Sequence, residues 1–481
     1  MQRFEEIHLP PDPVFPDELA ELGFFVTEDD KIRVIESPGQ APRYKIDRND
    51  RVNKVHIEAL HSAIHRIIAD RLTRMSMNPY PIPADGVAKS TAPVFVSDNI
   101  STASRIVVFI GELVEDLGLF SYREACDEGI SFGSVLDLTK AVLGENPENS
   151  ANALILANPG QRVWHNASGS PLTVESFRNR AQHSAVVRER PMSLRNAVES
   201  NTSLPEHTKY VFERILLPSL PLGVKVDIIG LSEGGYAALM YLKKNWMSWW
   251  PHISSIGLVN PEQVADVDFD FTELKNPKSF VSFVRERGRA WVLSSQPLGA
   301  REVGLGMHGC NCYSSGEDKR IACMVSRALA HIMAWANLMH SIPSLAEDIV
   351  VVEGEPNPSS KVISAMLGMD IDEDETTNGD EDEMPDNAIL EGLEGFVNGL
   401  ALKSNLVSFG ALAADDTTEA GENKLVYDND DIIDETPDGE NSDDSDVTVV
   451  HDPQPSFNNI VTRQQPQYGE PEESPRHSRG H

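Results

Sequence analysis

Short runs of successive apolar residues, many of them β-branched, alternate with helical patterns from the N-terminus to about residue 345. Such runs are typical of strands that are buried on both faces of a parallel sheet. The predicted strands are Val94–Ser97, Arg105–Ile110, Ala153–Ala157, Lys225–Gly230, Ser254–Val259, Ala290–Ser294 and Cys312–Ser315. Helical periodicity lies between them, for example over Val55–Leu72, His207–Leu217 and Gly235–Lys244. This alternation predicts an α/β fold with crossover helices.

The pattern divides the chain into a folded body, residues 1–345, and a tail, residues 346–481. Within the body, residues 161–206 form a long polar insertion that is rich in arginine. A connection of this length indicates either a lid or local disorder, and we expect partial disorder. The tail has too few apolar residues to offset the conformational entropy of folding, so most of it is expected to be disordered.

Charge is distributed unevenly along the chain. Residues 370–481 hold 30 acidic and 5 basic side chains, whereas the rest of the chain is only mildly acidic. General binding to nucleic acid or to anionic lipid is therefore not expected, and direct RNA binding by the body should be weak. No run reaches the ~18 to 20 apolar residues of a membrane span, and no secretory signal is apparent.

The four cysteines are too few and too irregularly spaced for a disulfide framework, which favours a reducing compartment. Cys310 and Cys312 lie near His308, but this spacing does not match a zinc site and no second pair follows. We therefore predict no metal and no cofactor.

Two apolar segments interrupt the acidic tail. Residues 389–400 repeat apolar side chains at helical spacing, which is typical either of a helix that docks into a groove or of a transient helix without a partner. In the second segment, residues 447–450, Val447, Val449 and Val450 follow a run of acids. This segment resembles a SUMO-interacting motif, although so short a pattern also arises by chance.

One motif could carry chemistry. Gly230-x-Ser232-x-Gly234 follows a predicted strand and opens a predicted helix, which is the pattern of a nucleophile elbow. Glycine is needed on both sides because the turn is too tight for side chains there. The backbone N–H of Glu233 could then face a developing oxyanion. The context predicts an α/β-hydrolase-like, mostly parallel sheet with flanking helices.

A seryl hydroxyl attacks at neutral pH only if an imidazole removes its proton and a carboxylate orients that imidazole. In this fold both partners follow the serine along the chain. His308 is the one plausible base, with Glu262 or Glu302 as the group that orients it. The strand that ends at Gly111 is followed by Glu112, whose carboxylate would repel an oxyanion.

Several segments together resemble the Arb-type, argonaute-binding domain family. They are Phe15–Leu19, Val94–Asn99, Arg105–Gly111, the elbow, Trp291–Leu298 and Ser314–Gly316. Members of this family occur in a subunit of the fungal argonaute siRNA chaperone complex, in related animal nuclear proteins, and fused to some fungal histone deacetylases. The resemblance implies an α/β-hydrolase-like fold, argonaute or chromatin-silencing proteins as partners, and location in the nucleus, with the cytoplasm also open.

This chain departs from the pattern of catalytic residues that the resemblance implies. Ser232 is kept, but the acid positions read Asn260 and Gly299, and the histidine position reads Arg320. The resemblance thus favours a non-catalytic interaction protein in small-RNA-directed heterochromatin formation. The alternatives are a serine hydrolase that uses Ser232 with a relocated histidine, and a binding module unrelated to silencing.

Overall fold

The computed structural model describes residues 11–347, except for 85, 87, 183–191, 262–266, 268, 270 and 304–307. The tail segments 389–400 and 447–450, including Val447, Val449 and Val450, lie outside the described residues, as does Glu262.

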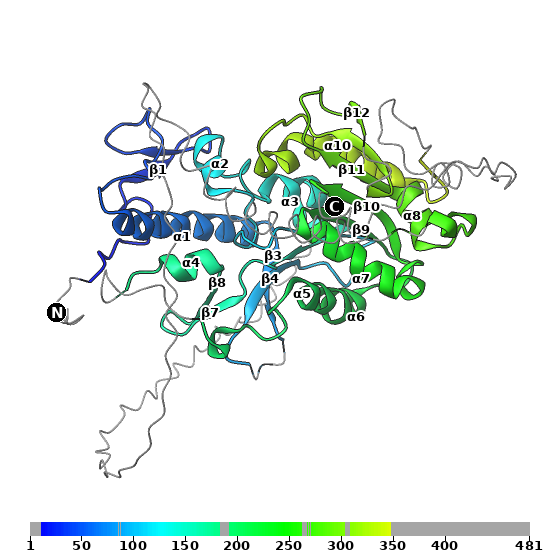
Figure 1. The fold of residues 1–481 in the computed structure, drawn as a ribbon, viewed down its shortest axis with the longest axis horizontal. Coiled ribbons are helices and arrows are strands. Elements are labelled where there is room, and N and C mark those ends of the chain that lie inside the picture. The colour runs from blue at the N-terminus through cyan, green and yellow to red at the C-terminus, as the bar shows by residue number, and fades with distance from the viewer. Residues whose placement is uncertain are drawn as a thin grey trace, which may run out of the picture. The chain divides into compact units, whose positions relative to one another are not determined.

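A nine-stranded sheet forms the centre of the fold, in the order β12-β13-β11-β10-β9-β5-β6-β4-β3 (Figure 1). Its strands are β3 (Met77–Ile82), β4 (Ala92–Ser97), β5 (Arg105–Ile110), β6 (Asn152–Ala157), β9 (Lys225–Leu231), β10 (Ile253–Val259), β11 (Gly288–Val292), β12 (Arg301–Glu302) and β13 (Asn311–Ser314). The strands from β6 to β13 in this order run parallel, while β3, β4 and β12 pair antiparallel at the two ends. This is the strand order of an α/β hydrolase, with β9 as the strand before the elbow. The predicted fold class is therefore confirmed.

Helices cover both faces of the sheet. The helices are α1 (Asp50–Arg74), α2 (Tyr122–Asp127), α3 (Leu136–Leu143), α4 (Val174–Asn179), α5 (Leu204–Tyr210), α6 (Leu217–Ser219), α7 (Glu233–Trp249), α8 (Phe280–Arg287) and α10 (Ile321–Ser341), with a π-helical turn, Val211–Leu216, between α5 and α6. Buried side chains of α1, α3 and α10 form one hydrophobic core with one face of the sheet, and those of α7 and α8 form a second core on the other face.

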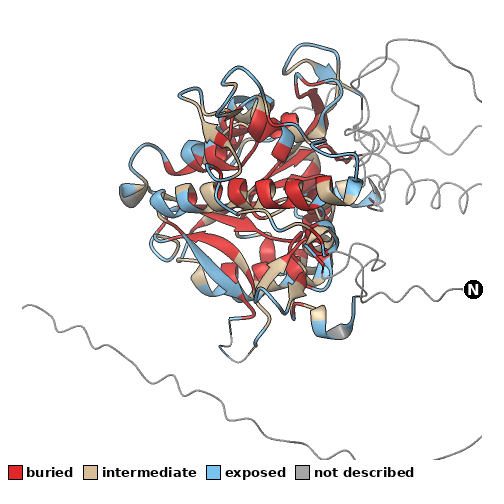
Figure 2. Cartoon of the chain, turned by 90° about the vertical axis from the view of Figure 1, so that its left-hand side faces the viewer, coloured by how far each residue is buried: buried red, intermediate tan, exposed pale blue. Residues whose placement is uncertain are grey.

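The central strands supply side chains to both cores. In β5, Val107 and Phe109 belong to the first core, whereas Ile106, Val108 and Ile110 belong to the second. Successive side chains of a strand point to opposite faces, so a strand between two helical layers must be apolar throughout. Figure 2 shows the result as buried residues concentrated in the sheet and on the helix faces that pack against it.

The helix α10 is long and apolar enough to cross a membrane by length and composition alone. Its side chains nevertheless pack into the first core, where the ring of Trp335 meets that of Trp291 edge to face, with centroids 5.6 Å apart. These contacts make α10 a core helix of the domain.

Smaller elements lie outside the main sheet. They are the antiparallel pair β1 (Phe24–Val26) and β2 (Ile32–Val34), and the antiparallel pair β7 (Val163–His165) and β8 (Ser170–Leu172). The second pair, together with α4, belongs to the insertion, residues 161–206. The described part of this insertion is folded around Val163, Leu172 and Phe177, while residues 183–191 lie outside the described residues.

Candidate functional site

The elbow lies where three neighbouring strands end. Register pairs Ile110 of β5 with Gly230 of β9, and Val259 of β10 with Leu231 of β9. The next residues along the three strands therefore meet at the carboxyl edge of the sheet. There Ser232 has φ 48° and ψ −122°, a conformation in the strained left-handed half of the map that a nucleophile elbow requires.

Glycines allow the elbow to pack closely. A side chain at Gly230 would overlap the backbone of Gly235, and one at Gly234 would overlap the carbonyl oxygens of Ile110 and Gly111. The end of β5 therefore presses directly against the start of α7. The predicted roles of Gly230 and Gly234 in the turn agree with this geometry.

The hydroxyl of Ser232 is held between two side chains. Its Oγ donates a hydrogen bond to Oε1 of Glu112 at 2.8 Å and accepts one from Nδ2 of Asn260 at 2.9 Å. Ser232 is only 2% exposed and Asn260 4% exposed. Among the described residues, no histidine ring forms a hydrogen bond with Ser232. The group that receives the seryl proton is thus a carboxyl group.

The environment of Glu112 favours its protonated form. Burial of the carboxyl group and the negative charge of Glu233 raise its pKa to about 7, although the hydrogen bond from Ser232 opposes the shift. By exposed surface area Glu112 is half-buried. Glu112 thus places an acidic side chain directly against the hydroxyl of Ser232.

More carboxyl groups surround this position. Burial raises the pKa of Glu115 well above its usual value, and the charges of Glu112, Asp116 and Glu175 add to the rise. Burial also raises the pKa of Glu58 to about 8. No local pattern could predict that these carboxyl groups lie near one another, because Glu58 and Glu175 belong to helices far apart along the chain. Among the described residues, no group of histidine, cysteine and carboxylate side chains is arranged to hold a metal ion.

His308 lies at the opposite edge of the sheet from Ser232. It comes just before β13, whose first residue, Asn311, is level with Ile229 of β9 through the intervening strands. His308 thus lies on the amino side of the sheet and Ser232 on the carboxyl side. Burial lowers the pKa of His308 to about 4. The structure does not bring the predicted base to the nucleophile, because β13 runs parallel to β9 and places its preceding loop at the wrong end.

The other positions of the degenerate triad have structural contacts of their own. The N–H of Gly299 donates to the carbonyl of Ser314 at 2.9 Å, and its missing side chain makes room for the ring of His331. Glu302, the alternative orienting acid, accepts a hydrogen bond from Ser294. Neither position supplies a carboxylate to Ser232.

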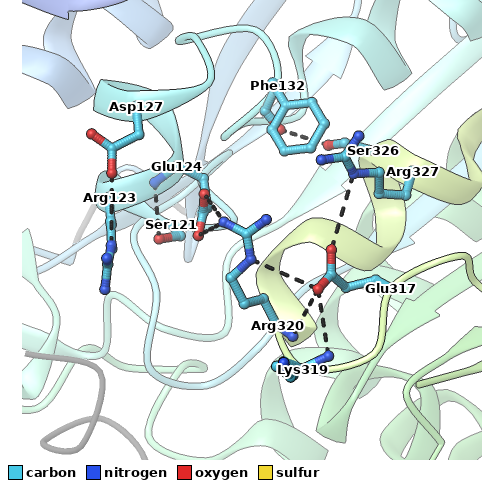
Figure 3. A network of polar contacts seen from close by, with 10 residues as sticks. All are labelled: Ser121, Arg123, Glu124, Asp127, Phe132, Glu317, Lys319, Arg320, Ser326 and Arg327. Carbon is cyan, nitrogen blue, oxygen red and sulfur yellow. Dashed lines mark hydrogen bonds and ion pairs between the residues drawn. The ribbon is translucent and has the colours of Figure 1, made fainter. Parts of the chain in front are cut away.

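Arg320 turns toward α2 (Figure 3). Its Nη1 donates to both carboxylate oxygens of Glu124, at 3.2 and 3.0 Å, and its Nε lies 3.7 Å from Glu317. Glu317 also lies 4.0 Å from Nε of Arg327. At the position where the resemblance places a catalytic histidine, this chain has an arginine that ties the loop after β13 to α2.

The Arb2 domain family matches residues 15–298 of the chain. The chain belongs to the Arb2 domain family. The resemblance seen in the sequence is thereby confirmed, and the Arb2 domain includes the elbow, Glu112 and Asn260 but ends before Arg320.

No curated protein sequence matches this Arb2-domain chain significantly. Among solved structures, a histone deacetylase from Saccharomyces cerevisiae is 11% identical with a TM-score of 0.34, covering 58% of this chain and 96% of that one. An esterase/lipase from an uncultured bacterium is 11% identical with a TM-score of 0.26, covering 60% of this chain and 97% of that one.

Proposed function

We propose that this Arb2-domain protein is a non-catalytic interaction protein that acts with argonaute or chromatin-silencing proteins in small-RNA-directed heterochromatin formation. The observation that supports the non-catalytic part is the pair of hydrogen bonds that hold Ser232 between Glu112 and Asn260. A hydroxyl without an imidazole partner is a weak nucleophile at neutral pH. Family membership supports the silencing role and a nuclear location.

Protein partners can be tested directly in cells. Affinity capture of the full-length protein, followed by mass spectrometry, should recover argonaute or other silencing proteins, and microscopy of a tagged protein should place it mainly in the nucleus. Recovery of neither class of partner, in a capture that retains the tagged protein itself, contradicts the proposed silencing role.

Two further contacts belong to this proposal. The acidic tail would supply a SUMO contact through residues 447–450, so replacing both Val449 and Val450 with alanine should abolish capture on immobilised SUMO. RNA would be held by the argonaute partner, because the body of the chain has no excess of positive charge. Unchanged SUMO capture by the double variant rejects the tail contact.

One observation favours a second candidate, a serine hydrolase in which Glu112 is the base. Its carboxyl group already accepts the hydrogen bond of Ser232, and a pKa of about 7 suits a general base. The near-complete burial of Ser232 argues against it, because an acyl carbon cannot reach an oxygen that is only 2% exposed.

The rate of ester hydrolysis separates these two candidates. If Glu112 acts as a base, the hydrolysis of p-nitrophenyl acetate should rise through pH 7 and fall in both Ser232→Ala and Glu112→Gln. If the protein is non-catalytic, the wild type and both variants should share the same low background rate at every pH.

A further inference from the structure

The C-terminal end of α7 presents apolar side chains to solvent. Met247 is 79% exposed, and Trp250, three residues later on the same side of the helix, is half-buried. Pro251, which follows the helix, is exposed. Trp246 and Trp249 point to the other side and are buried in the second core, so they hold this turn of α7 in place. Large apolar side chains grouped on a rigid surface are typical of protein interaction sites.

Three lysines surround these apolar side chains. Nζ of Lys278 lies 5.2 Å from the ring centroid of Trp250, and Nζ of Lys225 donates a hydrogen bond to the carbonyl of Pro251 at 2.5 Å. Lys244 is exposed on α7, one turn before the apolar residues. In the described part of the chain, no carboxylate forms an ion pair with any of the three lysines. An apolar centre with a charged rim is the usual composition of a protein interface.

We propose that this end of α7 is a docking surface for a partner peptide in which carboxylates flank apolar side chains. The α7 surface, as we name it, consists of the residues just described: Met247, Trp250, Pro251, Lys225, Lys244 and Lys278. Lys225 begins β9 and Pro251 precedes β10, so the surface reaches the amino edge of the sheet. Ser232 follows β9 at the carboxyl edge. The proposal therefore goes beyond the proposed function and does not involve Ser232.

Charge complementarity identifies the class of partner. Among the described residues that are close to Lys278 along the chain, Glu273 in the turn Phe271–Lys275 is the one acid, so the α7 surface keeps an excess of positive charge. Carboxylates of a partner would complement this charge, and its apolar side chains would cover Met247 and the edge of Trp250. Methionine suits such a contact because its side chain adapts to the shape of the partner.

Other occupants fit the α7 surface less well. A two-fold dimer through this surface would place it against itself and would bring the lysines of both copies together. An anionic membrane or a nucleic acid extends beyond the surface, so it would also meet the rest of a chain whose net charge is −34. At physiological ionic strength charges act over about 8 Å, so a short peptide responds chiefly to the local lysines.

Peptide selection on the full-length protein tests this class of partner without assuming a sequence. A phage library of random peptides is selected on the immobilised wild-type protein. The enriched peptides should combine aspartate and glutamate with leucine, phenylalanine or other apolar residues. Fluorescence polarisation of a labelled synthetic copy of the most enriched peptide then gives its dissociation constant.

Two variants locate the binding site of this peptide. Met247→Asp removes the most exposed apolar side chain of the α7 surface and adds a repelling charge. The double variant Lys244→Glu with Lys278→Glu reverses two of the positive charges. Each variant should raise the dissociation constant at least tenfold. All three residues are exposed, so both variants should keep the circular dichroism spectrum of the wild type.

Matched controls make the same changes elsewhere. Val14→Asp replaces an apolar side chain that is 87% exposed. Lys140→Glu with Lys319→Glu changes the net charge as much as the lysine variant of the α7 surface, at side chains that are 56% and 81% exposed. Both controls should bind the peptide within twofold of the wild type.

Four results would overturn the α7 surface. They are a selection that enriches no peptide, enriched peptides without acidic residues, unchanged affinity in both α7 variants, and wild-type binding to vesicles of phosphatidylcholine and phosphatidylserine that is lost in Met247→Asp. The last result would identify a membrane as the occupant. Peptide binding requires neither argonaute nor an unreactive Ser232, so this proposal and the proposed function fail separately.

Discussion

Replacing Gly234 with alanine should destabilise the domain, because the new methyl group has no space. Its carbon would lie 2.6 Å from the carbonyl oxygen of Gly111 and still closer to that of Ile110. Both neighbours are backbone atoms, one at the end of β5 and one just after it, so neither can rotate away. Overpacking of this kind costs about 1–3 kcal/mol, from which the better helix propensity of alanine recovers up to ~1 kcal/mol. We expect a net loss of about 1–2 kcal/mol in the free energy of unfolding.

Gly111→Ala is the matched control, because Gly111 is the residue whose backbone oxygen lies against Gly234. A side chain there meets only a ring carbon of Phe109, at an ordinary 3.5 Å, and the residue does not have a positive φ. Its effect should stay within about 0.5 kcal/mol. Urea unfolding of the full-length protein, followed by both tryptophan fluorescence and circular dichroism, measures the two values. If Gly234→Ala proves no more destabilising than Gly111→Ala, the close approach of β5 and α7 is wrong.

Three other predictions concern side chains away from the elbow turn. Asp227→Ala should cost about 3–5 kcal/mol in urea unfolding, because it leaves the buried guanidinium of Arg105, 2.5 Å from the carboxylate, without its counter-ion. The double variant Asp227→Ala with Arg105→Met removes both charges and should cost less. Arg320→Ala should lower the free energy of unfolding by about 1 kcal/mol, since its side chain is 44% exposed, while Lys319→Ala should have no measurable effect. Equal losses of stability in the two variants would contradict the network of Figure 3. The pKa of Glu58 is raised to about 8 in the folded protein, so protonated Glu58 stabilises the fold in full below its unfolded pKa and less as the pH rises to 8. Glu58→Gln should therefore reduce the loss of folding stability between pH 6 and pH 8 by about 2 kcal/mol, and an unchanged pH profile would refute this.

Much of the sheet could be predicted from the sequence. The runs over residues 105–110, 153–157 and 225–230 match β5, β6 and β9 to within a residue, because strands between two helical layers are apolar on both faces. The edge strand β3 was missed, since it contains Pro79 and Pro81 and exposes its middle residues.

The site could be predicted only in part. The elbow and the unfavourable carboxylate of Glu112 follow from local sequence, and the structure places both beside each other. The position of His308 could not be judged without knowing that it precedes the parallel strand β13. The direct hydrogen bond from Asn260 to Ser232 depends on the register of β10 with β9, which no local pattern encodes.

The central claim is that Ser232 stays unreactive because a carboxyl group and an amide hold it where serine hydrolases provide an imidazole. Intact-mass spectrometry of the full-length protein after incubation with a fluorophosphonate tests this most directly. An active serine hydrolase in the same tube shows that the reagent works. We predict no adduct on the wild-type protein. A stoichiometric adduct that disappears in Ser232→Ala would contradict the account.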